Sequence, residues 1–512
     1  MALISVPLLL GAAILATVLT AIRRLVSAGA AVPGPRLNVL SSLPLKYHEF
    51  RGQRTRYVHG LHRRYGSVVR LAPNEVAFAS LPALKEIYLS NGSGYDKTEF
   101  YHLFRQYGTP TMFSTLDKQT HSRRRRILAD RYANSSVVKE DALQGLRARA
   151  AHFTERAAAA PHGVLDTYIA LHSYAFDGVT HHLFHPHGSD ALRDAADEAI
   201  MREVSFDNSL ARRLLEYYNR PLERVADALG LLPPQRSIPR AKQIVLDAVD
   251  SSLAAVGDSR AAGDEHGDSK AEGAAAATFT LLARLQDPSL GLTRMQMAAE
   301  CMDHMAAGIE TTGDVLCWLM WQLSLPASQA MQTRLYQELQ GASPAPSSYD
   351  SLPYLHAVLK EGLRVFPSIP MSLPRYVPAG GREVDGTWLP AGTIVSCQPY
   401  TMHRFDEAVF SRPDAFDPER WLGADAELDA EMNRRFFAFS NGGRGCLGRH
   451  LAMAEMKLLL RDVYSQFQTV LAGTDGKPPA DMSMSDQIIS SRPKGQSCLL
   501  KFIPREPAKE SL

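Results

Sequence analysis

One cysteine near the C-terminal end of the chain stands in a sequence suited to metal chemistry. Cys446 lies in a glycine-rich stretch, Phe439-Ser-Asn-Gly-Gly-Arg-Gly-Cys-Leu-Gly448, and Arg449–Leu460 directly after it has the apolar spacing of a helix. The positive end of that helix and its free backbone N–H groups favour a thiolate. Glycines let the backbone approach a large, flat group, and a soft anionic sulfur suits iron. The alternative for a lone cysteine is a small buried hydrophobe without chemistry.

An acid and two hydroxyls stand together inside a long apolar segment. Ala298–Leu325 has helical spacing, Pro326 ends it, and the segment contains Ala307-Gly-Ile-Glu-Thr-Thr312. An acid beside a hydroxyl can pass a proton to a bound reactant. The alternative is that Thr312 bonds its own helix backbone and that Glu310 reaches solvent.

A second acid lies three residues before an arginine on another apolar helix. Glu361 and Arg364 share one face of the predicted helix Leu355–Phe366, and Arg420 follows in Pro418-Glu-Arg-Trp421. On a surface such a pair contributes little to stability. If the pair is buried, both signs of charge must be present, because a single orphaned charge would cost several kcal/mol.

Taken together, these segments resemble the cytochrome P450 family. The cysteine stretch matches the family's haem-ligand pattern, Phe-x-x-Gly-x-Arg-x-Cys-x-Gly, at every fixed position: Phe439, Gly442, Arg444, Cys446 and Gly448. Ala307–Thr312 resembles the family's oxygen-activation segment. The helical acid and base with the later arginine resemble a family triad that holds the core beneath the haem: Glu361, Arg364 and Arg420.

The resemblance implies a P450 fold that carries haem b, with Cys446 as the axial thiolate ligand and therefore the metal ligand. It implies that Thr311 hydrogen-bonds the reacting oxygen, that Glu310 helps to relay protons, and that Gly308 makes room for dioxygen. The cofactor-binding residues that it implies are Cys446, Arg444, Phe439, Gly448, Arg375, His121 and Arg125. His121 departs from the family, which often has tryptophan four residues before the arginine, but a histidine N–H can also donate to a carboxylate.

The wider pattern predicts a mainly helical protein with a minor sheet. Val68–Ala72 and Glu75–Ala79 alternate around a turn, Pro374–Val395 has the turn signals of short strands, and Ser251–Ala277 is typical of a surface connection. We expect a membrane anchor at 1–24, a Pro/Gly hinge at 25–36 and a catalytic domain at 37–505. The 512 residues carry a net charge of +2, which gives no indication of nucleic-acid binding, and the five cysteines are too widely spaced for a disulfide framework.

The N-terminal segment predicts a location on a membrane. Leu3–Ile22 is uncharged and long enough to span a bilayer, and Arg23 and Arg24 follow it. The positive-inside rule then places the rest of the chain in the cytosol, and the family resemblance favours the endoplasmic reticulum. A cleaved signal peptide, with Ser27–Ala31 as its cleavage site, is the alternative.

The resemblance also implies partners. Electrons from NADPH would come through a flavoprotein reductase, with cytochrome b5 as a second donor, and would enter over a basic patch of Arg123–Arg126, Arg449 and Lys457. Similarity to filamentous-fungal members, carried by Arg70, His121 and Pro418–Trp421, implies a small lipophilic secondary metabolite as substrate: a polyketide, terpenoid or alkaloid. By family position its cavity is expected to be lined by Tyr101–Phe113, His304, Met305, Ile369–Ser372 and Ile488–Ser490.

Two other functions fit the same family pattern. One is a P450-fold isomerase or dehydratase that works without O₂, although such relatives often lose the threonine that this chain keeps at 311. The other is a haem-binding protein without catalysis, in which a proton-delivery pair would be idle. His181, His182, His185 and His187 cluster with metal-like spacing between the first and third, but no acid or HExxH pattern accompanies them.

Overall fold

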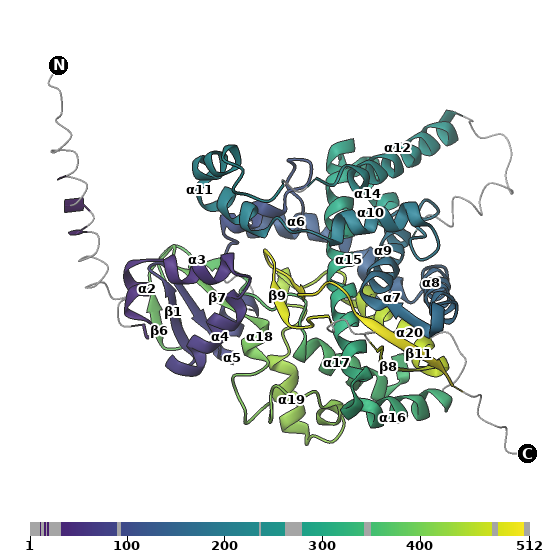
Figure 1. Cartoon of the computed structure of the whole chain (residues 1–512). Helices are drawn as coiled ribbons and strands as arrows, with labels where there is room; N and C mark the ends of the chain where they lie inside the picture. Colours follow the sequence, from purple (N-terminus) through teal and green to yellow (C-terminus); the bar gives the residue numbers. More distant parts are fainter. Residues whose placement is uncertain are drawn as a thin grey trace, which may run out of the picture.

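The computed structural model describes residues 11, 15, 16, 18, 19, 32–89, 94–234, 237–261, 279–341, 350–473 and 480–505. Helices make up most of these ranges, and a smaller sheet-rich part that includes the N-terminal helices lies beside the helical body (Figure 1). None of the helices within these ranges is both long and apolar enough to cross a membrane. The predicted anchor, 1–24, lies almost entirely outside the described residues.

The main sheet joins two distant parts of the sequence. Its strands are β1 (Val68–Ala72), β2 (Glu75–Phe78), β4 (Arg375–Tyr376) and β7 (Ile394–Cys397), in the order β1-β2-β7-β4. The predicted hairpin is confirmed, because β1 and β2 pair antiparallel. Strand β2 pairs parallel with β7, and β7 pairs antiparallel with β4. This pairing places Arg375 in one sheet with a strand about 300 residues earlier, β2, with β7 between them.

Short helices and one hairpin surround this sheet. They are α2 (Arg36–Leu40), α3 (Leu43–Phe50), α4 (Arg54–Tyr65), α5 (Leu81–Leu84), β5 (Arg382–Val384) and β6 (Thr387–Leu389). The described end of the predicted hinge also packs here: the Arg70 N–H donates to the Pro33 carbonyl (2.8 Å), and Val32 is buried. Residues 32–36 are therefore part of the folded body.

Helix α15 (Arg294–Ser324) runs through the middle of the helical body (Figure 1). A capping box between Thr293 and Gln296 begins it, and the chain turns away at Leu325 before Pro326. Both ends agree closely with the predicted segment. The helices packed around it are α9 (Thr167–Phe184), α12 (Pro239–Ala261), α17 (Pro353–Val365), α16 (Gln329–Gln340) and α20 (Arg449–Gln466).

The remaining elements complete the helical body and two small sheets. The helices are α6 (Lys118–Leu128), α7 (Asn134–Val137), α8 (Glu140–Ala158), α10 (Ala195–Ser205), α11 (Leu210–Ala228), α14 (Leu281–Leu285), α18 (Pro399–Met402) and α19 (Ala426–Arg435). The strands are β3 (Val164–Asp166), β8 (Phe467–Leu471), β9 (Met484–Asp486), β10 (Ser491–Pro493) and β11 (Leu499–Pro504). The prediction of a connection from Ser251 is wrong at its start, because α12 continues to Ala261; 262–278 lie outside the described residues.

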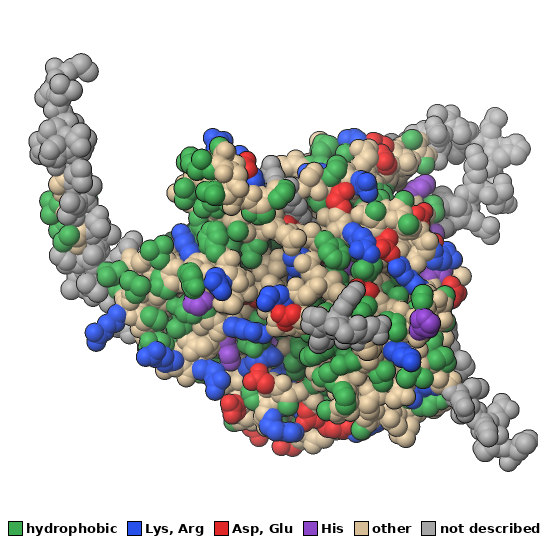
Figure 2. All heavy atoms as spheres, in the orientation of Figure 1, with side chains coloured by type: hydrophobic (Ala, Val, Ile, Leu, Met, Phe, Trp, Pro, Cys, Tyr) green, Lys and Arg blue, Asp and Glu red, His purple; other side chains and the backbone are tan. Residues whose placement is uncertain are grey.

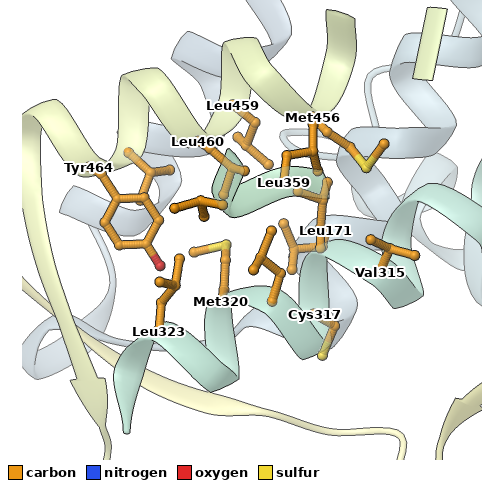
Figure 3. Packing of buried hydrophobic residues seen from close by; sticks show 14 of the residues in the cluster. Leu171, Val315, Cys317, Met320, Leu323, Leu359, Met456, Leu459, Leu460 and Tyr464 are labelled. Atoms are coloured by element: carbon orange, nitrogen blue, oxygen red, sulfur yellow. The ribbon is translucent and has the colours of Figure 1, made fainter. Parts of the chain in front are cut away.

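The largest apolar core lies between the second half of α15 and helices α9, α17 and α20. Figure 3 shows Val315, Met320 and Leu323 of α15 packed against Leu359 of α17 and against two leucines of α20, Leu459 and Leu460. These side chains are almost completely buried. The core fixes α15 and α20 relative to each other, and the two segments that carry the predicted chemistry lie on or directly before these helices.

Two glycines of α15 allow α9 to approach closely. A Cβ added at Gly308 would lie 2.6 Å from a methyl carbon of Val179, and one at Gly313 would lie 2.8 Å from the ring of His172. Neither distance is possible without moving the helices apart. The missing side chain of Gly308 is therefore needed for helix packing, and its role in making room for dioxygen stays a prediction.

This contact predicts the effect of Gly308→Ala. In an open helix the change would stabilise the protein by up to about 1 kcal/mol, but overpacking against Val179 costs about 1–3 kcal/mol, so we expect a net loss of unfolding free energy. Denaturant titration measures it. Gly60→Ala in α4 is the matched control, because nothing lies within 4 Å of its added Cβ, and it should be neutral or stabilising. A second change, Val179→Ala, should restore part of the loss; no recovery would contradict the contact.

Candidate active site

A cavity of about 340 Å³ lies between α15, the cysteine segment, the chain before α6 and the segments 368–375 and 487–492. All the residues predicted for catalysis and cofactor binding line it: Cys446, Arg444, Phe439, Gly448, Arg375, His121, Arg125, Thr311 and Glu310. These residues come from four separate parts of the chain, so the fold brings together what the sequence only suggests.

The cysteine segment is held by its own backbone and by one close contact. The Cys446 N–H donates to the Phe439 carbonyl at 2.8 Å, and Gly442–Arg444 form one turn of 3₁₀ helix. Gly442 has φ +67°, and a Cβ there would collide with the Tyr88 carbonyl oxygen, so glycine is required on both grounds. Helix α20 begins three residues after the cysteine, as predicted.

The sulfur of Cys446 faces the cavity. Its side chain is accessible, whereas Cys301, Cys317, Cys397 and Cys498 are buried. It nevertheless lies deep in the protein, so burial raises its pKa, while the Gly448 N–H and the charges of Arg125 and Arg449 act in the opposite direction. The net pKa is raised. Cys446 therefore needs a cation at the sulfur to become a thiolate, and a bound metal ion would supply it.

Several cations converge on the same cavity. Arg444 donates to the Leu116 carbonyl (2.7 Å), and burial followed by the charge of Arg375 lowers its pKa to about 10. Arg375 donates to the Tyr101 hydroxyl (2.8 Å). Burial and then the charges of Lys97 and Arg444 lower the pKa of His121 to about 2. Mutual repulsion of buried cations is unfavourable unless an anion lies among them.

The sequence did not identify Lys97 as part of this set. Its ammonium donates to the Phe113 carbonyl (2.5 Å) and lies 4.4 Å from the centres of the Tyr101 and Phe113 rings. An isolated β-bridge places Lys97 next to Arg375. Burial, and then Arg375 and Arg444, lower its pKa well below the ordinary value. In the sequence Lys97 looks like an ordinary surface lysine, because the β-bridge that brings it to the cavity joins it to a residue far along the chain.

Helix α15 supplies the other wall. Thr311 donates its hydroxyl to the Ala307 carbonyl at 2.7 Å, so the bond to the helix backbone that was considered for Thr312 is made by Thr311. Ala307 is exposed although most of the helix is buried, because it borders the cavity. Glu310 lines the cavity as well, and Thr312 is buried. The oxygen of Thr311 keeps a lone pair directed away from its donor bond and can accept from a ligand.

The family model described as "Cytochrome P450" matches residues 32–499. The chain is a cytochrome P450. Cytochrome P450 monooxygenase orf2 of Aspergillus niger is 28% identical over 489 residues, which are 92% of each chain. An averantin hydroxylase of Aspergillus parasiticus is 30% identical over 434 residues, 84% of this chain and 83% of the relative. Cytochrome P450 monooxygenase aflV of the same species is 27% identical over 483 residues, 92% and 91% of the two chains. The protein is an oxidoreductase of the P450 monooxygenase class.

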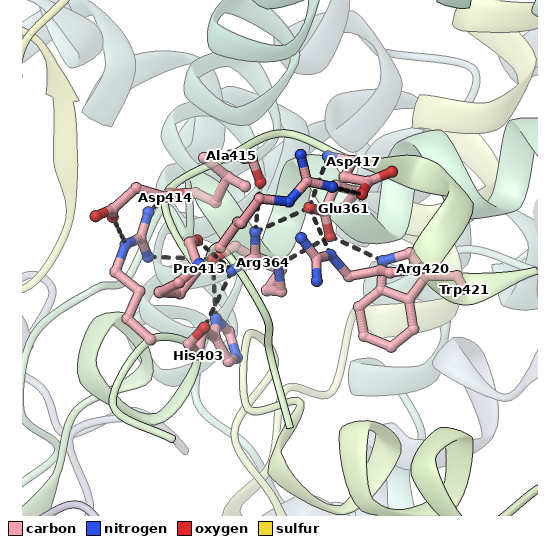
Figure 4. Close-up of polar contacts among 12 residues, drawn as sticks. Glu361, Arg364, His403, Pro413, Asp414, Ala415, Asp417, Arg420 and Trp421 are labelled. Carbon is pink, nitrogen blue, oxygen red and sulfur yellow. Dashed lines mark hydrogen bonds and ion pairs between the residues drawn. The ribbon is translucent and has the colours of Figure 1, made fainter. Parts of the chain in front are cut away.

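In this P450 a buried ion network supports the cysteine segment. Glu361 and Arg364 are fully buried and form two bonds of 2.8 Å, and Arg420 donates to Glu361 at 3.0 Å (Figure 4). Trp421 and the Asp417 N–H also donate to Glu361. Burial raises the pKa of Glu361, but the bonds and charges of the two arginines outweigh it, and the net pKa is lowered. The predicted triad is thus confirmed, because Glu361 bonds both Arg364 and Arg420.

The network reaches the cysteine segment through one histidine. Arg364 donates to the carbonyls of His403 (3.0 Å), Pro413 and Ala415. The ring of His403 contacts the Arg364 carbonyl through Nδ1 (3.1 Å) and accepts the Phe437 N–H through Nε2 (2.8 Å). Phe437 stands two residues before Phe439. The geometry of the cysteine segment therefore depends on charges more than 70 residues earlier.

The structure corrects part of the predicted basic patch. Arg123 and Arg126 are exposed, whereas Arg124 lies 3.5 Å from Glu300 and Arg125 donates to the Gly445 carbonyl (2.7 Å). Lys457 is buried and pairs with Asp350 at 2.6 Å, so it is not a surface cation.

The predicted substrate-facing residues are confirmed only in part as cavity residues. Those that line the cavity are Tyr101, Leu103, Phe104, Gln106, Met112, Phe113, His304, Ile369 and Ile488–Ser490. Met305 belongs to an apolar core instead, and its neighbour two residues earlier, Asp303, lines the cavity. On a helix, residues three or four positions apart share a face, whereas residues one or two positions apart do not. Met305 and Asp303 therefore point in different directions.

The histidine cluster packs as aromatic rings. His181 contacts the His185 and Phe279 rings with centres 4.9 and 5.2 Å away, and His182 packs on Tyr132. In the described part of the chain no group of three or more His, Cys, Asp or Glu side chains could hold a metal ion.

We predict that Glu361→Gln destabilises the protein by about 3–5 kcal/mol, because it leaves two buried arginines without a counter-charge. Denaturant titration at pH 7 measures the loss, with Glu383→Gln on the exposed strand β5 as the control. Since the folded-state pKa of Glu361 is lowered, its contribution is present above the ordinary glutamate pKa and is lost as pH falls through the folded-state value. The difference between wild type and variant should therefore shrink in acid; a difference that does not depend on pH would contradict the ionic role.

Proposed function

We propose that this protein is a haem-thiolate monooxygenase that inserts one oxygen atom from O₂ into a small lipophilic organic substrate. The observation that carries the proposal is the shared cavity. It holds an accessible cysteine sulfur, a set of buried cations and a helix hydroxyl beside an acid. A monooxygenase needs each of these: a metal ligand, a place for the cofactor's anionic groups and a source of protons.

Haem b fits the groups present. Cys446 would be the axial ligand, with Phe439 and Gly448 in its segment. Arg444, Arg375, His121, Arg125 and Lys97 would surround the two propionates, and this would remove the mutual repulsion of the cations. When bound, a haem held by a thiolate supplies O₂ activation with electrons from outside the protein.

Thr311 and Glu310 would deliver protons. The Thr311 hydroxyl donates to the Ala307 carbonyl and can rotate to donate toward the cavity instead. Glu310, the preceding residue, also lines the cavity and can replace the proton that the hydroxyl gives up. Two adjacent residues of α15 that both line the cavity would thus provide a proton donor and its source.

The substrate is proposed to be a secondary metabolite, such as a polyketide, terpenoid or alkaloid, that this enzyme modifies by hydroxylation or a related oxidation. The support is an apolar wall of Leu103, Phe104, Phe113 and Ile488 and the similarity to fungal P450 monooxygenases, one of them an averantin hydroxylase. An apolar wall with few polar groups selects lipophilic ligands.

Electrons are proposed to come from NADPH through a flavoprotein reductase, with cytochrome b5 as a second donor. Exposed Arg123, Arg126 and Arg449 offer positive charge to an acidic partner.

We further propose that residues 1–24 anchor the protein in the endoplasmic reticulum membrane, that 25–36 link the anchor to the domain at 37–505, and that the domain faces the cytosol. Figure 2 shows hydrophobic side chains gathered over α11 and α3, where the exposed ones are Leu43, Tyr47, Phe50, Leu222 and Val225. Such a face suits contact with lipid.

Cys446→Ala should abolish the thiolate-type absorption of the reduced, CO-bound protein, because no other cysteine borders the cavity among the described residues. The spectrum of purified protein reconstituted with haem is the measurement. Cys397→Ala is the control, since Cys397 is buried away from the cavity, and its spectrum should be unchanged. A thiolate-type spectrum that survives Cys446→Ala would refute the assignment.

Thr311→Val should uncouple the reaction. The change keeps the shape but removes the hydroxyl, and positioned proton delivery contributes about 10²–10⁴-fold to a rate. With purified reductase, we expect NADPH consumption to continue while product per NADPH falls at least about tenfold and peroxide accumulates. Thr312→Val, at the buried neighbour, should have a smaller effect. Unchanged coupling in Thr311→Val would remove this residue from the mechanism, and a protein that never consumes NADPH with reductase would fail the proposed function itself.

A further inference from the structure

A buried acid of α15 lies one turn beyond Glu310 in the same cavity and is not used by the proposed mechanism. Asp314 lines the cavity, and it comes four residues after Glu310 and three after Thr311. Residues three and four apart on a helix are neighbours on its surface, with about 5–6 Å between their Cβ atoms. Asp314 is therefore the helical neighbour both of the proposed proton donor and of the acid that supplies it.

Asp314 faces a histidine of the neighbouring helix. His172 of α9 is fully buried, and its Nε2 lies 3.5 Å from the Oδ1 oxygen of Asp314. In the described part of the chain neither of these two atoms has a hydrogen bond to another group. Gly313 allows this approach, because the His172 ring occupies the space that a Cβ would need there. The two side chains thus form a pair that is enclosed by the protein.

The other ring nitrogen of His172 shows where its proton is. Nδ1 lies 2.7 Å from the carbonyl oxygen of Tyr168, and a carbonyl can only accept, so Nδ1 carries a hydrogen. A neutral ring therefore presents the lone pair of Nε2 to Asp314. A lone pair and a carboxylate repel each other, whereas a proton between them makes a hydrogen bond. The pair consequently holds one proton besides the one on Nδ1.

Burial keeps that proton on Asp314. The side chain is 2% exposed, and burial raises the pKa of its carboxyl group. Transfer of the proton to His172 would create two buried charges, which an apolar interior disfavours. The ionisable groups around the pair are Glu310 and Cys317 on α15, Tyr168 on α9 and Arg492 on β10. Arg492 is the cation of this set, and its guanidinium already donates to the Ser205 and Asp207 carbonyls (3.1 and 2.6 Å).

We propose that Asp314 and His172 form a proton relay that acts through Glu310. When Glu310 has passed its proton to Thr311, the Asp314 carboxyl group gives its own proton to the Glu310 carboxylate, directly or through one water molecule. The Asp314 carboxylate then faces the lone pair of His172, and this repulsion favours the uptake of one proton from solvent. The inference rests on the proposed function and adds two residues that act through Glu310 rather than on the reacting atoms.

The return path of the proton also lies along the cavity. Asp207, Arg213 and Gln487 line it together with Asp314, and Arg213 and Gln487 are partly exposed to solvent. Each cycle therefore takes one proton from solvent and delivers one to Thr311, so that the pair ends in the state in which it began.

The first test detects the proton on Asp314 without turnover. In purified haem-containing protein at pH 7, the infrared spectrum of wild type minus that of Asp314→Asn should contain the carbonyl band of a protonated carboxylic acid, and this band should shift in D₂O. Asp314→Asn suits the test because its amide can still donate to Nε2 of His172 but has no proton to transfer. Absence of the band would overturn the inference, since Asp314 would then be ionised.

The second test measures proton supply during turnover. NADPH consumption is followed with excess purified reductase and no added substrate, between pH 6 and pH 8. Asp314→Asn should be close to wild type at pH 6 but at least about tenfold slower at pH 8, because Glu310 must then regain its proton from solvent alone. The slowing should be larger in D₂O, and Asp314→Glu, which keeps an acid, should restore most of the rate.

Glu455→Gln is the matched control. Glu455 is also a buried acid that lines the cavity, and burial raises its pKa to about 8, but it belongs to α20. This variant should keep the pH profile of wild type. A loss in Asp314→Asn that is equal at every pH would overturn the inference, because the pair would then only hold α9 against α15. Wild-type rates in Asp314→Asn at every pH would overturn it as well.

A second variant covers the case in which Asp314→Asn does not fold. Asp314→Leu removes the carboxyl group and buries no new polar group, so it must show the same loss at high pH for the inference to stand. The CO-bound spectrum of each sample reports on the cofactor site. A wild type that gives this spectrum but consumes no NADPH would fail the proposed function, whereas the infrared band would still confirm or overturn the proton on Asp314.

Discussion

The buried pairing of Glu361 with two arginines is the interaction on which the cysteine segment depends. A carboxylate and two guanidinium groups are removed from water together, and each is stable there only because the others are present. Their bonds join a helix to the chain between His403 and Trp421, which then leads through α19 to the cysteine segment. Many apolar side chains could fill the same volume, but none could fix the direction of so many backbone carbonyls at once.

A second constraint acts inside the cavity. Burial, and then the charges of neighbouring cations, lower the pKa values of Arg444, Lys97 and His121, and burial raises the pKa of Cys446. The two problems have one solution, which is a ligand that carries a metal cation at its centre and negative charge at its edge. The buried cations and the buried cysteine therefore each indicate one charge that the cofactor must carry. The same reasoning implies that the protein is more stable with the cofactor than without it.

The sequence predicts the local elements of this structure better than the relations between them. The hairpin of β1 and β2, the limits of α15 and the cysteine stretch depend on turn residues, apolar spacing and capping within a few positions. The roles of Lys97 and Lys457 depend on a bridge to Arg375 and a pair with Asp350, and no local pattern contains those partners. Gly308 shows the same limit, because no local pattern contains its close contact with Val179 of α9.

His403 has one further consequence for how the cysteine segment is held. Because its Nε2 accepts the Phe437 N–H, the ring proton must be on Nδ1, where it donates to the Arg364 carbonyl. Burial, followed by the charges of Arg364 and Arg404, keeps the pKa of the ring well below its usual value, so the ring stays neutral and this tautomer is fixed. The ring also stacks on Phe436 with 13° between the planes. The position therefore requires a flat group that donates on one edge, accepts on the other and stacks on its face. The proton on Nδ1 leaves Nε2 free to accept, and this bond orients the backbone before the cysteine.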